Sequence, residues 1–139
     1  MGQDRNTLSH NKITMKYLYY KIYQILRKVK TNNTPATNSM ILLSLIQGAN
    51  IIALQALLNQ FIHVKIKLGS KDEIILFACS LGLVIYVINY LKLYKKLEEI
   101  CESYENESKT QSRIGYTVLI LYIFVSAVLI YFVSSKYPL

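Results

Sequence analysis

The sequence predicts an all-α integral membrane protein with three transmembrane helices, preceded by an amphipathic helix at the membrane interface. Hydrophobic residues make up 53% of the 139-residue chain and charged residues only 17%, whereas about 25% of a typical soluble chain is charged. The charges are also unevenly placed, since none falls within 40–62, 74–91 or 114–133. Each of these windows is about 20 residues long, which is enough for a helix to cross a ~30 Å hydrocarbon core.

This composition argues against a water-soluble enzyme core and against a nucleic-acid-binding domain. The net charge of +8 would suggest nucleic acid as the partner of a soluble chain, but here the basic residues flank the apolar windows. We therefore expect them to contact the anionic headgroups of a lipid bilayer. The two cysteines, Cys79 and Cys101, lack metal-binding spacing and are expected to be free thiols.

Residues 1–38 are predicted to form a disordered tail over 1–11 and then a basic helix with a linker over 12–38. A second methionine, Met15, opens the helix, and we hypothesise that translation starts there. The apolar residues of the helix follow i, i+3, i+4, i+7 spacing and fill one arc of a helical wheel: Met15, Leu18, Tyr19, Ile22, Ile25, Leu26 and Val29.

Basic side chains fall outside this arc, and five of them are expected at the membrane surface: Lys16, Lys21, Arg27, Lys28 and Lys30. A cationic amphipathic helix suits the interface between lipid and water. The alternative is a cytosolic helix packed on the rest of the protein, which we disfavour because so small a chain offers little soluble surface for packing.

The first span is predicted over 39–68. Thr34 followed by Pro35 has the form of a helix start, with proline at the first helical position. Gly69 is a natural helix stop, so a tight outer turn is expected over 69–72.

The second span is predicted as one long helix over 73–107, which leaves the membrane and continues into the cytoplasm. No glycine or proline follows its apolar window that would end the helix. A turn over 108–112 leads into the third span, 113–134, and a short tail follows over 135–139.

The orientation of the spans is predicted from the basic residues near their ends. Nine lie on one side of the membrane: Lys21, Arg27, Lys28, Lys30, Lys92, Lys95, Lys96, Lys109 and Arg113. Four lie on the other side: Lys65, Lys67, Lys71 and Lys136. The side with more basic residues is expected to be cytoplasmic, which places the N-terminus inside the cell and the C-terminus outside the inner membrane.

One half of the first span is predicted to carry a polar face. On a helical wheel this face contains Ser44, Gln47, Gly48, Asn50, Gln55 and Asn59. Amides that faced lipid would lack hydrogen-bond partners, so the face is expected to meet protein or water. Packing against other helices is favoured, because uncharged polar residues commonly join spans. The alternative is a pore lining or a solute site.

The second span is predicted to pack through a stripe that contains Ala78, Gly82, Tyr86 and Asn89. Ala78 and Gly82 form a small-xxx-small pair, which allows two helix backbones to approach closely. We expect this stripe and the polar face of the first span to form the contacts between helices.

Catalysis is not expected from this sequence, and neither is a cofactor or a metal ion. No charged residue or histidine lies within the three apolar windows, although ion and proton pathways are usually built from such groups. The sequence also lacks a P-loop, a GxSxG motif and an HExxH motif. The glutamates at 98–107 have the pattern of a solvated helix face.

The run MKYLYYKIYQILRKVK, the three spans and the linker YKKLEEICESYENESK together resemble small uncharacterised multi-pass membrane proteins of low-GC bacteria. This resemblance is one of architecture and implies no functional residues. The expected function is non-enzymatic and depends on helix–helix contacts with a second copy or with a membrane partner, as in an accessory, assembly or immunity-type subunit. The alternative is an oligomeric pore or holin-like channel that uses the polar face of the first span.

Overall fold

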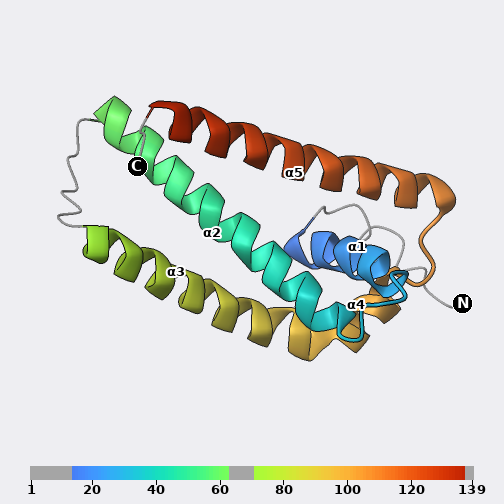
Figure 1. Cartoon of the computed structure of the whole chain (residues 1–139). Coiled ribbons are helices and arrows are strands. Elements are labelled where there is room, and N and C mark those ends of the chain that lie inside the picture. The colour runs from blue at the N-terminus through green and yellow to red at the C-terminus, as the bar shows by residue number, and fades with distance from the viewer. Residues whose placement is uncertain (1–13, 63–70, 137–139) are drawn as a thin grey trace, which may run out of the picture.

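A computed structural model describes residues 14–62 and 71–136, and all regular structure within these ranges is helical. Three long helices run up, down and up: α2 (Pro35–Ile62), α3 (Lys71–Lys92) and α5 (Lys109–Lys136) (Figure 1). The expected all-α class is therefore confirmed. The predicted outer turn at 69–72 and the end of the first span at 63–68 fall outside the described residues.

Three helical segments are long and apolar enough to cross a membrane, as the charge-free windows predict: Pro35–Leu58, Ile75–Tyr104 and Lys109–Val133. Large apolar side chains cover their outer surfaces, and Leu45, Leu83 and Phe124 are each more than 60% exposed. Exposed apolar area of this extent marks a surface that another apolar phase covers. The chain is thus compatible with a multi-pass membrane protein.

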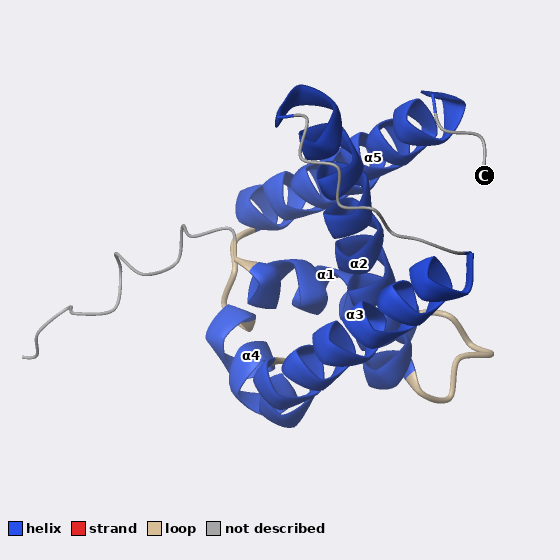
Figure 2. Ribbon diagram, turned by 90° about the vertical axis from the view of Figure 1, so that its left-hand side faces the viewer, coloured by secondary structure: helices blue, strands red, loops and turns tan. Residues whose placement is uncertain are grey.

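Helix α2 occupies the centre of the bundle, and α3 and α5 pack on different sides of it (Figures 1 and 2). It begins at Pro35, the position that the start signal predicts, and the Asn38 amide donates to the Thr34 carbonyl at 3.0 Å. Proline suits this first position because its missing N–H would have no partner within the helix.

The remaining helices gather at the end of the bundle where α2 and α5 begin and α3 ends. They are α1 (Met15–Arg27), the short 3-10 helix η1 (Tyr94–Lys96) and α4 (Leu97–Tyr104). Helix α1 packs on α2 and lies between α4 and α5 (Figure 2). We call α1, η1, α4 and the first turns of α2 and α5 the cap. The buried apolar core is centred on the cap and reaches beyond it to Leu43, Leu93 and Leu119. Its members within the cap are Tyr17, Leu18, Tyr19, Tyr20, Ile22, Met40 and Ile100.

The environment of α1 differs from the predicted one. Part of the expected apolar arc is more than 40% exposed, namely Met15, Ile25 and Val29, while three residues outside the arc are buried, namely Tyr17, Tyr20 and Lys21. The prediction that Lys21 lies at the membrane surface is therefore wrong. Helix α4 and the first turns of α2 and α5 supply the packing surface that so short a chain was expected to lack.

The single helix predicted over 73–107 is also wrong, because the chain bends at Leu93. Helix α3 ends at Lys92, and η1 separates it from α4. No glycine or proline causes this bend. Leu93 and Ile100, on either side of η1, are 3% and 1% exposed and both belong to the buried core that is centred on the cap. Burial of both side chains accounts for the bend, since tertiary packing commonly overrides local helix propensity.

Helix α5 begins at Lys109, so the turn predicted over 108–112 is shorter than expected. Ser108 and Gln111 form a reciprocal capping box, in which Gln111 N donates to Ser108 Oγ at 3.2 Å and Ser108 N donates to Gln111 Oε1 at 3.0 Å. This arrangement satisfies two backbone donors at the helix start. Both residues come from the stretch that was assigned to the turn.

Candidate functional site

Lys21 lies at the centre of the cap with its side chain fully buried. Its ammonium nitrogen pairs with the Glu107 carboxylate and lies 2.9 Å from Ser112 Oγ. The Glu107 side chain is itself only 12% exposed. Removing two charges from water costs several kcal/mol for each ion unless close pairing and further hydrogen bonds offset it. The pair therefore joins α1 to the segment between α4 and α5.

Three tyrosine rings surround the Lys21 ammonium. Its nitrogen lies 5.2 Å from the ring centroid of Tyr17, 5.4 Å from that of Tyr20 and 4.6 Å from that of Tyr116. At distances below about 6 Å the negative face of each ring attracts a cation. We call Lys21, Glu107 and these three tyrosines the lysine cage.

The hydroxyl groups of the cage tyrosines are also satisfied. Tyr17 Oη lies 3.0 Å from Glu107 Oε2 and 3.1 Å from the Gln111 carbonyl oxygen. Tyr20 donates to the Tyr104 carbonyl at 3.3 Å. These bonds allow the apolar rings to be buried without leaving a polar atom unpaired.

Gly115 allows α1 to approach α5 closely. It is buried, and a Cβ atom at this position would lie 2.7 Å from Lys21 Cε and would overlap the Tyr17 hydroxyl. Any larger residue would therefore push both cage side chains away. The glycine is required by space rather than by an unusual backbone angle.

Burial in the cap keeps the tyrosine hydroxyls protonated. Burial, the hydrogen bond to Glu107 and the charge of Glu107 raise the pKa of Tyr17 well above its usual value near 10. Burial and, secondarily, the charge of Glu107 raise the pKa of Tyr20 to about 12. At neutral pH these groups are hydrogen-bond donors and not bases, so the cage holds a fixed arrangement of charges.

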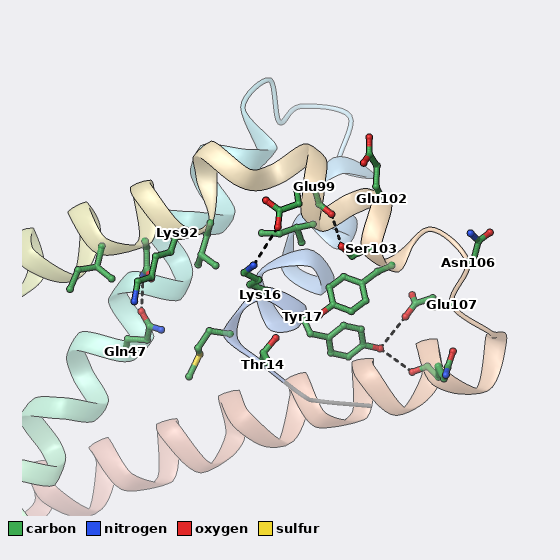
Figure 3. A pocket seen from close by; sticks show the side chains of 17 residues that line it. Thr14, Lys16, Tyr17, Gln47, Lys92, Glu99, Glu102, Ser103, Asn106 and Glu107 are labelled. Carbon is green, nitrogen blue, oxygen red and sulfur yellow. Dashed lines mark hydrogen bonds and ion pairs between the residues drawn. The ribbon is translucent and has the colours of Figure 1, made fainter. Parts of the chain in front are cut away.

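A cavity of about 1080 Å³ lies beside the lysine cage (Figure 3). Its walls come from the first turn of α1, the end of α3, α4 with the segment that follows it, and the start of α5, and Gln47 of α2 also lines it. Tyr17 and Glu107 belong to both the cage and the cavity wall. The lining includes charged side chains of both signs.

Part of the predicted polar face joins α2 to α3. Asn89 is buried, and its amide nitrogen lies 2.8 Å from Ser44 Oγ and 2.7 Å from Gln47 Oε1. Next to this contact, Gly48 brings the two helices together, since a Cβ there would lie 3.7 Å from Ile85 Cδ1. The structure thus brings together predicted residues from two different spans.

Another predicted residue, Asn50, joins α2 to α5. Its amide nitrogen donates to Ser126 Oγ at 2.8 Å and lies 3.4 Å from the Tyr122 hydroxyl. Ser126 in turn donates to the Tyr122 carbonyl at 2.7 Å. The polar face is therefore divided between two neighbouring helices.

The rest of the polar face has a different environment. Gln55 is half-buried, and within the described part of the chain its side chain forms no hydrogen bond. Asn59 belongs to α2, but its side chain lies outside what the structure describes.

The stripe predicted on α3 makes only part of the contact with α2. Asn89 is buried and bonds to α2, and Ala78 is half-buried. Gly82 is exposed with no atom within 4 Å of the position that a Cβ would take, and Tyr86 is 38% exposed. Ile85, next to Tyr86 in sequence, is buried instead, so the close approach predicted for the Ala78–Gly82 pair is not formed among the described residues.

The other predicted surface lysines and the arginine are accessible. Arg27, Lys28 and Lys30 are exposed, and Lys16 is half-buried with its ammonium 3.8 Å from Glu99. Their contact with lipid headgroups stays a prediction.

The sequence pattern does not reveal the lysine cage. A helical wheel places Lys21 on the polar side of α1, the glutamate run that includes Glu107 has the pattern of a solvated face, and no local signal marks Gly115. One local signal was present, since Tyr17, Tyr20 and Lys21 lie on one side of a helix at i, i+3, i+4 spacing. Their partners, however, lie 84 to 94 residues away in sequence.

Comparison of the chain with protein-family models, with curated proteins and with solved structures finds no match. Among the described residues, no group of three or more histidine, cysteine, aspartate or glutamate side chains could hold a metal ion. The function is therefore inferred from the geometry of the cap and of the three long helices.

Proposed function

We propose that this chain is a non-enzymatic, multi-pass protein of a bacterial inner membrane that acts through helix–helix contacts with a second copy or a membrane partner. In this arrangement the cap lies on the cytoplasmic side, because Lys95, Lys96, Lys109 and Arg113 lie at or beside it. An accessory, assembly or immunity-type role fits such a protein.

The observation that carries this proposal is the use of polar groups inside the spans. Asn89 and Asn50 both form hydrogen bonds to side chains of neighbouring helices in the same chain. In membranes, such bonds hold helices together with about 0.6–2 kcal/mol each. The outer surfaces of α3 and α5 are apolar, with Leu83 and Phe124 as examples, so contacts with a partner would depend on close packing.

The exposed face of α3 is the surface that we assign to a partner helix. Gly82 leaves a flat site on this face, since no neighbouring atom lies within 4 Å of its Cβ position. Tyr86 lies one turn further along and is 38% exposed. A small residue beside an aromatic one suits the close approach of a second helix.

An oligomeric pore is the second candidate, and one observation favours it. The Gln55 amide is half-buried and has no hydrogen bond within the described part of the chain, so it could face water in an assembly. The intrachain bonds of Ser44, Gln47 and Asn50 weigh against this alternative, because they occupy groups that a lumen would need.

Leakage from vesicles distinguishes the two candidates. We expect purified protein to release no trapped dye from vesicles over a wide range of protein-to-lipid ratios. Dye release that Gln55→Leu abolishes, with helix content and assembly intact, would instead support a pore lined by amides.

Cross-linking tests the helix contact itself. Cys79 is an exposed thiol on α3, so bifunctional thiol reagents can report its neighbours in membranes after Cys101→Ser removes the second thiol. We expect a cross-linked product in the Cys101→Ser chain and its loss when Gly82→Leu is added. A product unaffected by Gly82→Leu would mean that another face makes the contact.

Thiol labelling of intact cells tests the orientation. In a chain with Cys79→Ala and Cys101→Ala, a cysteine introduced at Lys67 should react with an impermeant reagent. A cysteine introduced at Lys109 should be protected. The reverse pattern would contradict the proposed placement of the cap.

A further inference from the structure

The cavity beside the lysine cage has a lining that changes in character along its length (Figure 3). Gln47, Ile88 and Asn89 line the part next to the long helices, and all three come from charge-free windows of the sequence. Lys92 follows directly after one of these windows, whereas Lys16 belongs to α1 and lies against Glu99 of α4. Glu102 lies further along the α4 wall. The lining thus combines amide and apolar groups beside the long helices with charges of both signs at the cap.

Two charges in this wall form no ion pair with any residue that the structure describes. Neither Lys92 nor Glu102 takes part in an ion pair within the part of the chain that the structure describes. Glu99 forms two ion pairs, with Lys16 across the cavity at 3.8 Å and with Lys96 at 3.6 Å. The three side chains are 45–59% exposed. Exposed pairs of this kind contribute little to stability, so a ligand can replace them.

We propose that the cavity binds a phospholipid whose headgroup carries a primary amine, as in phosphatidylethanolamine. Lys16 and Lys92 would hold the phosphate, and Glu99 and Glu102 would accept hydrogen bonds from the ammonium. The amides of Gln47 and Asn89 lie where the glycerol esters would be. The proposal depends on the membrane placement above but not on the contact with a partner.

The mixed charge of the lining selects this headgroup over its alternatives. Carboxylates in the same wall oppose a purely anionic headgroup, and the two lysines oppose a purely cationic ligand. A choline headgroup has the same net charge, but its quaternary ammonium has no N–H to donate. A primary ammonium offers three donors to the glutamates.

The size and position of the cavity also fit a lipid. The volume of about 1080 Å³ lies slightly above the ~300–1,000 Å³ that ligand pockets usually measure, which is enough for a headgroup and the glycerol. The acyl chains would leave the cavity past Ile88, which is 45% exposed on the apolar surface of α3.

Binding of short-chain lipids to the full-length protein in mild detergent tests the proposal. Dihexanoyl phosphatidylethanolamine, phosphatidylcholine and phosphatidylglycerol are titrated separately by calorimetry, and the ethanolamine lipid should bind most tightly. Lys92→Gln should lower the affinity for the ethanolamine lipid and for the choline lipid alike, by roughly tenfold, because the phosphate of each loses a charged partner. Glu102→Gln should lower affinity for the ethanolamine lipid alone, towards that of the choline lipid.

Two exposed charges outside the cavity provide matched controls. Lys95 and Glu98 lie close in sequence to the tested residues but do not line the cavity, so Lys95→Gln and Glu98→Gln should leave all three affinities unchanged. Circular dichroism checks that every variant keeps its helix content, which we expect because Lys92 and Glu102 are exposed.

Three results would overturn the lipid site: equal affinity for the three headgroups, tightest binding of phosphatidylglycerol, or controls that act as strongly as the cavity variants. These results would not affect the proposed function in helix–helix contacts, because vesicle leakage and cross-linking test that function separately. Conversely, leakage through an amide-lined pore would overturn the proposed function without removing the headgroup preference.

Discussion

Removal of the negative charge of Glu107 should destabilise the cap strongly, because Glu107→Gln leaves the Lys21 ammonium without its counter-ion. The Lys21 side chain is fully buried and cannot turn towards water. An uncompensated buried charge typically costs 3–5 kcal/mol. We expect about 3 kcal/mol, since Ser112 Oγ at 2.9 Å and three tyrosine rings still interact with the ammonium.

The opposite change, Lys21→Met, should cost less. It leaves Glu107, which is 12% exposed and keeps the hydrogen bond from the Tyr17 hydroxyl at 3.0 Å. We therefore expect a loss of about 1–2 kcal/mol, in the range for a partly satisfied polar group that loses its partner. The double variant should be about as stable as Lys21→Met, so the two effects should be far from additive.

Unfolding of the full chain in mild detergent by titration with sodium dodecyl sulfate, followed by the near-ultraviolet signal of the tyrosines, measures these free energies. Glu98→Gln serves as a control, because Glu98 is exposed and such a change should alter stability by less than about 0.5 kcal/mol. If Glu107→Gln lowers the free energy of unfolding by no more than Lys21→Met does, the different burial of the two charges does not determine the cost of removing each partner. That result would refute the prediction.

Three further predictions concern other parts of the fold. Gly115→Ala should destabilise the cap by about 1–3 kcal/mol, because a Cβ would overlap two side chains of α1. Gly82→Ala is the matched control. It has open space at its Cβ position and should be neutral or slightly stabilising in the same assay. Asn89→Leu should lower the free energy of unfolding by about 1–2 kcal/mol through loss of two bonds to α2, and an unchanged value would show that these bonds contribute nothing. The pKa of Tyr20 is raised from 10.0 to about 12 in the folded protein. The stability that its protonated hydroxyl contributes should therefore be complete below pH 10 and lost between about pH 10 and 12. Tyr20→Phe should make this alkaline loss of stability shallower when the free energies of unfolding at pH 9 and pH 11.5 are compared.

The positions of the three long helices could be predicted because they depend on a property of the local sequence. Windows without charges, such as 114–133, have to be removed from water as a unit, and their length matches a bilayer. The start of α2 was predictable for the same reason, since Thr34 and Pro35 act within a single turn. The amides at Gln47 and Asn50 were recognised as groups that need partners, but the helices that supply those partners were not.

The environment of α1 could not be predicted, because it is determined by residues far away in sequence. A helical wheel places Lys21 on the polar side, and only the Glu107 carboxylate, 86 residues further on, makes its burial favourable. The bend at Leu93 has the same kind of cause. No helix-breaking residue marks it, and the gain comes from burying Leu93 and Ile100 in one core with α1.

The lysine cage also determines when the protein can complete its assembly during synthesis. Helix α1 leaves the ribosome first, whereas its partners Glu107, Gln111 and Ser112 follow 86 to 94 residues later. At about 5–20 residues per second, α1 waits for roughly 5 to 20 seconds with its lysine unpaired. Its basic, amphipathic character suits a temporary position on the lipid surface during this interval. A chain that stops before Glu107 would keep Lys21 without its counter-ion, so α1 could not take its buried place in the cap.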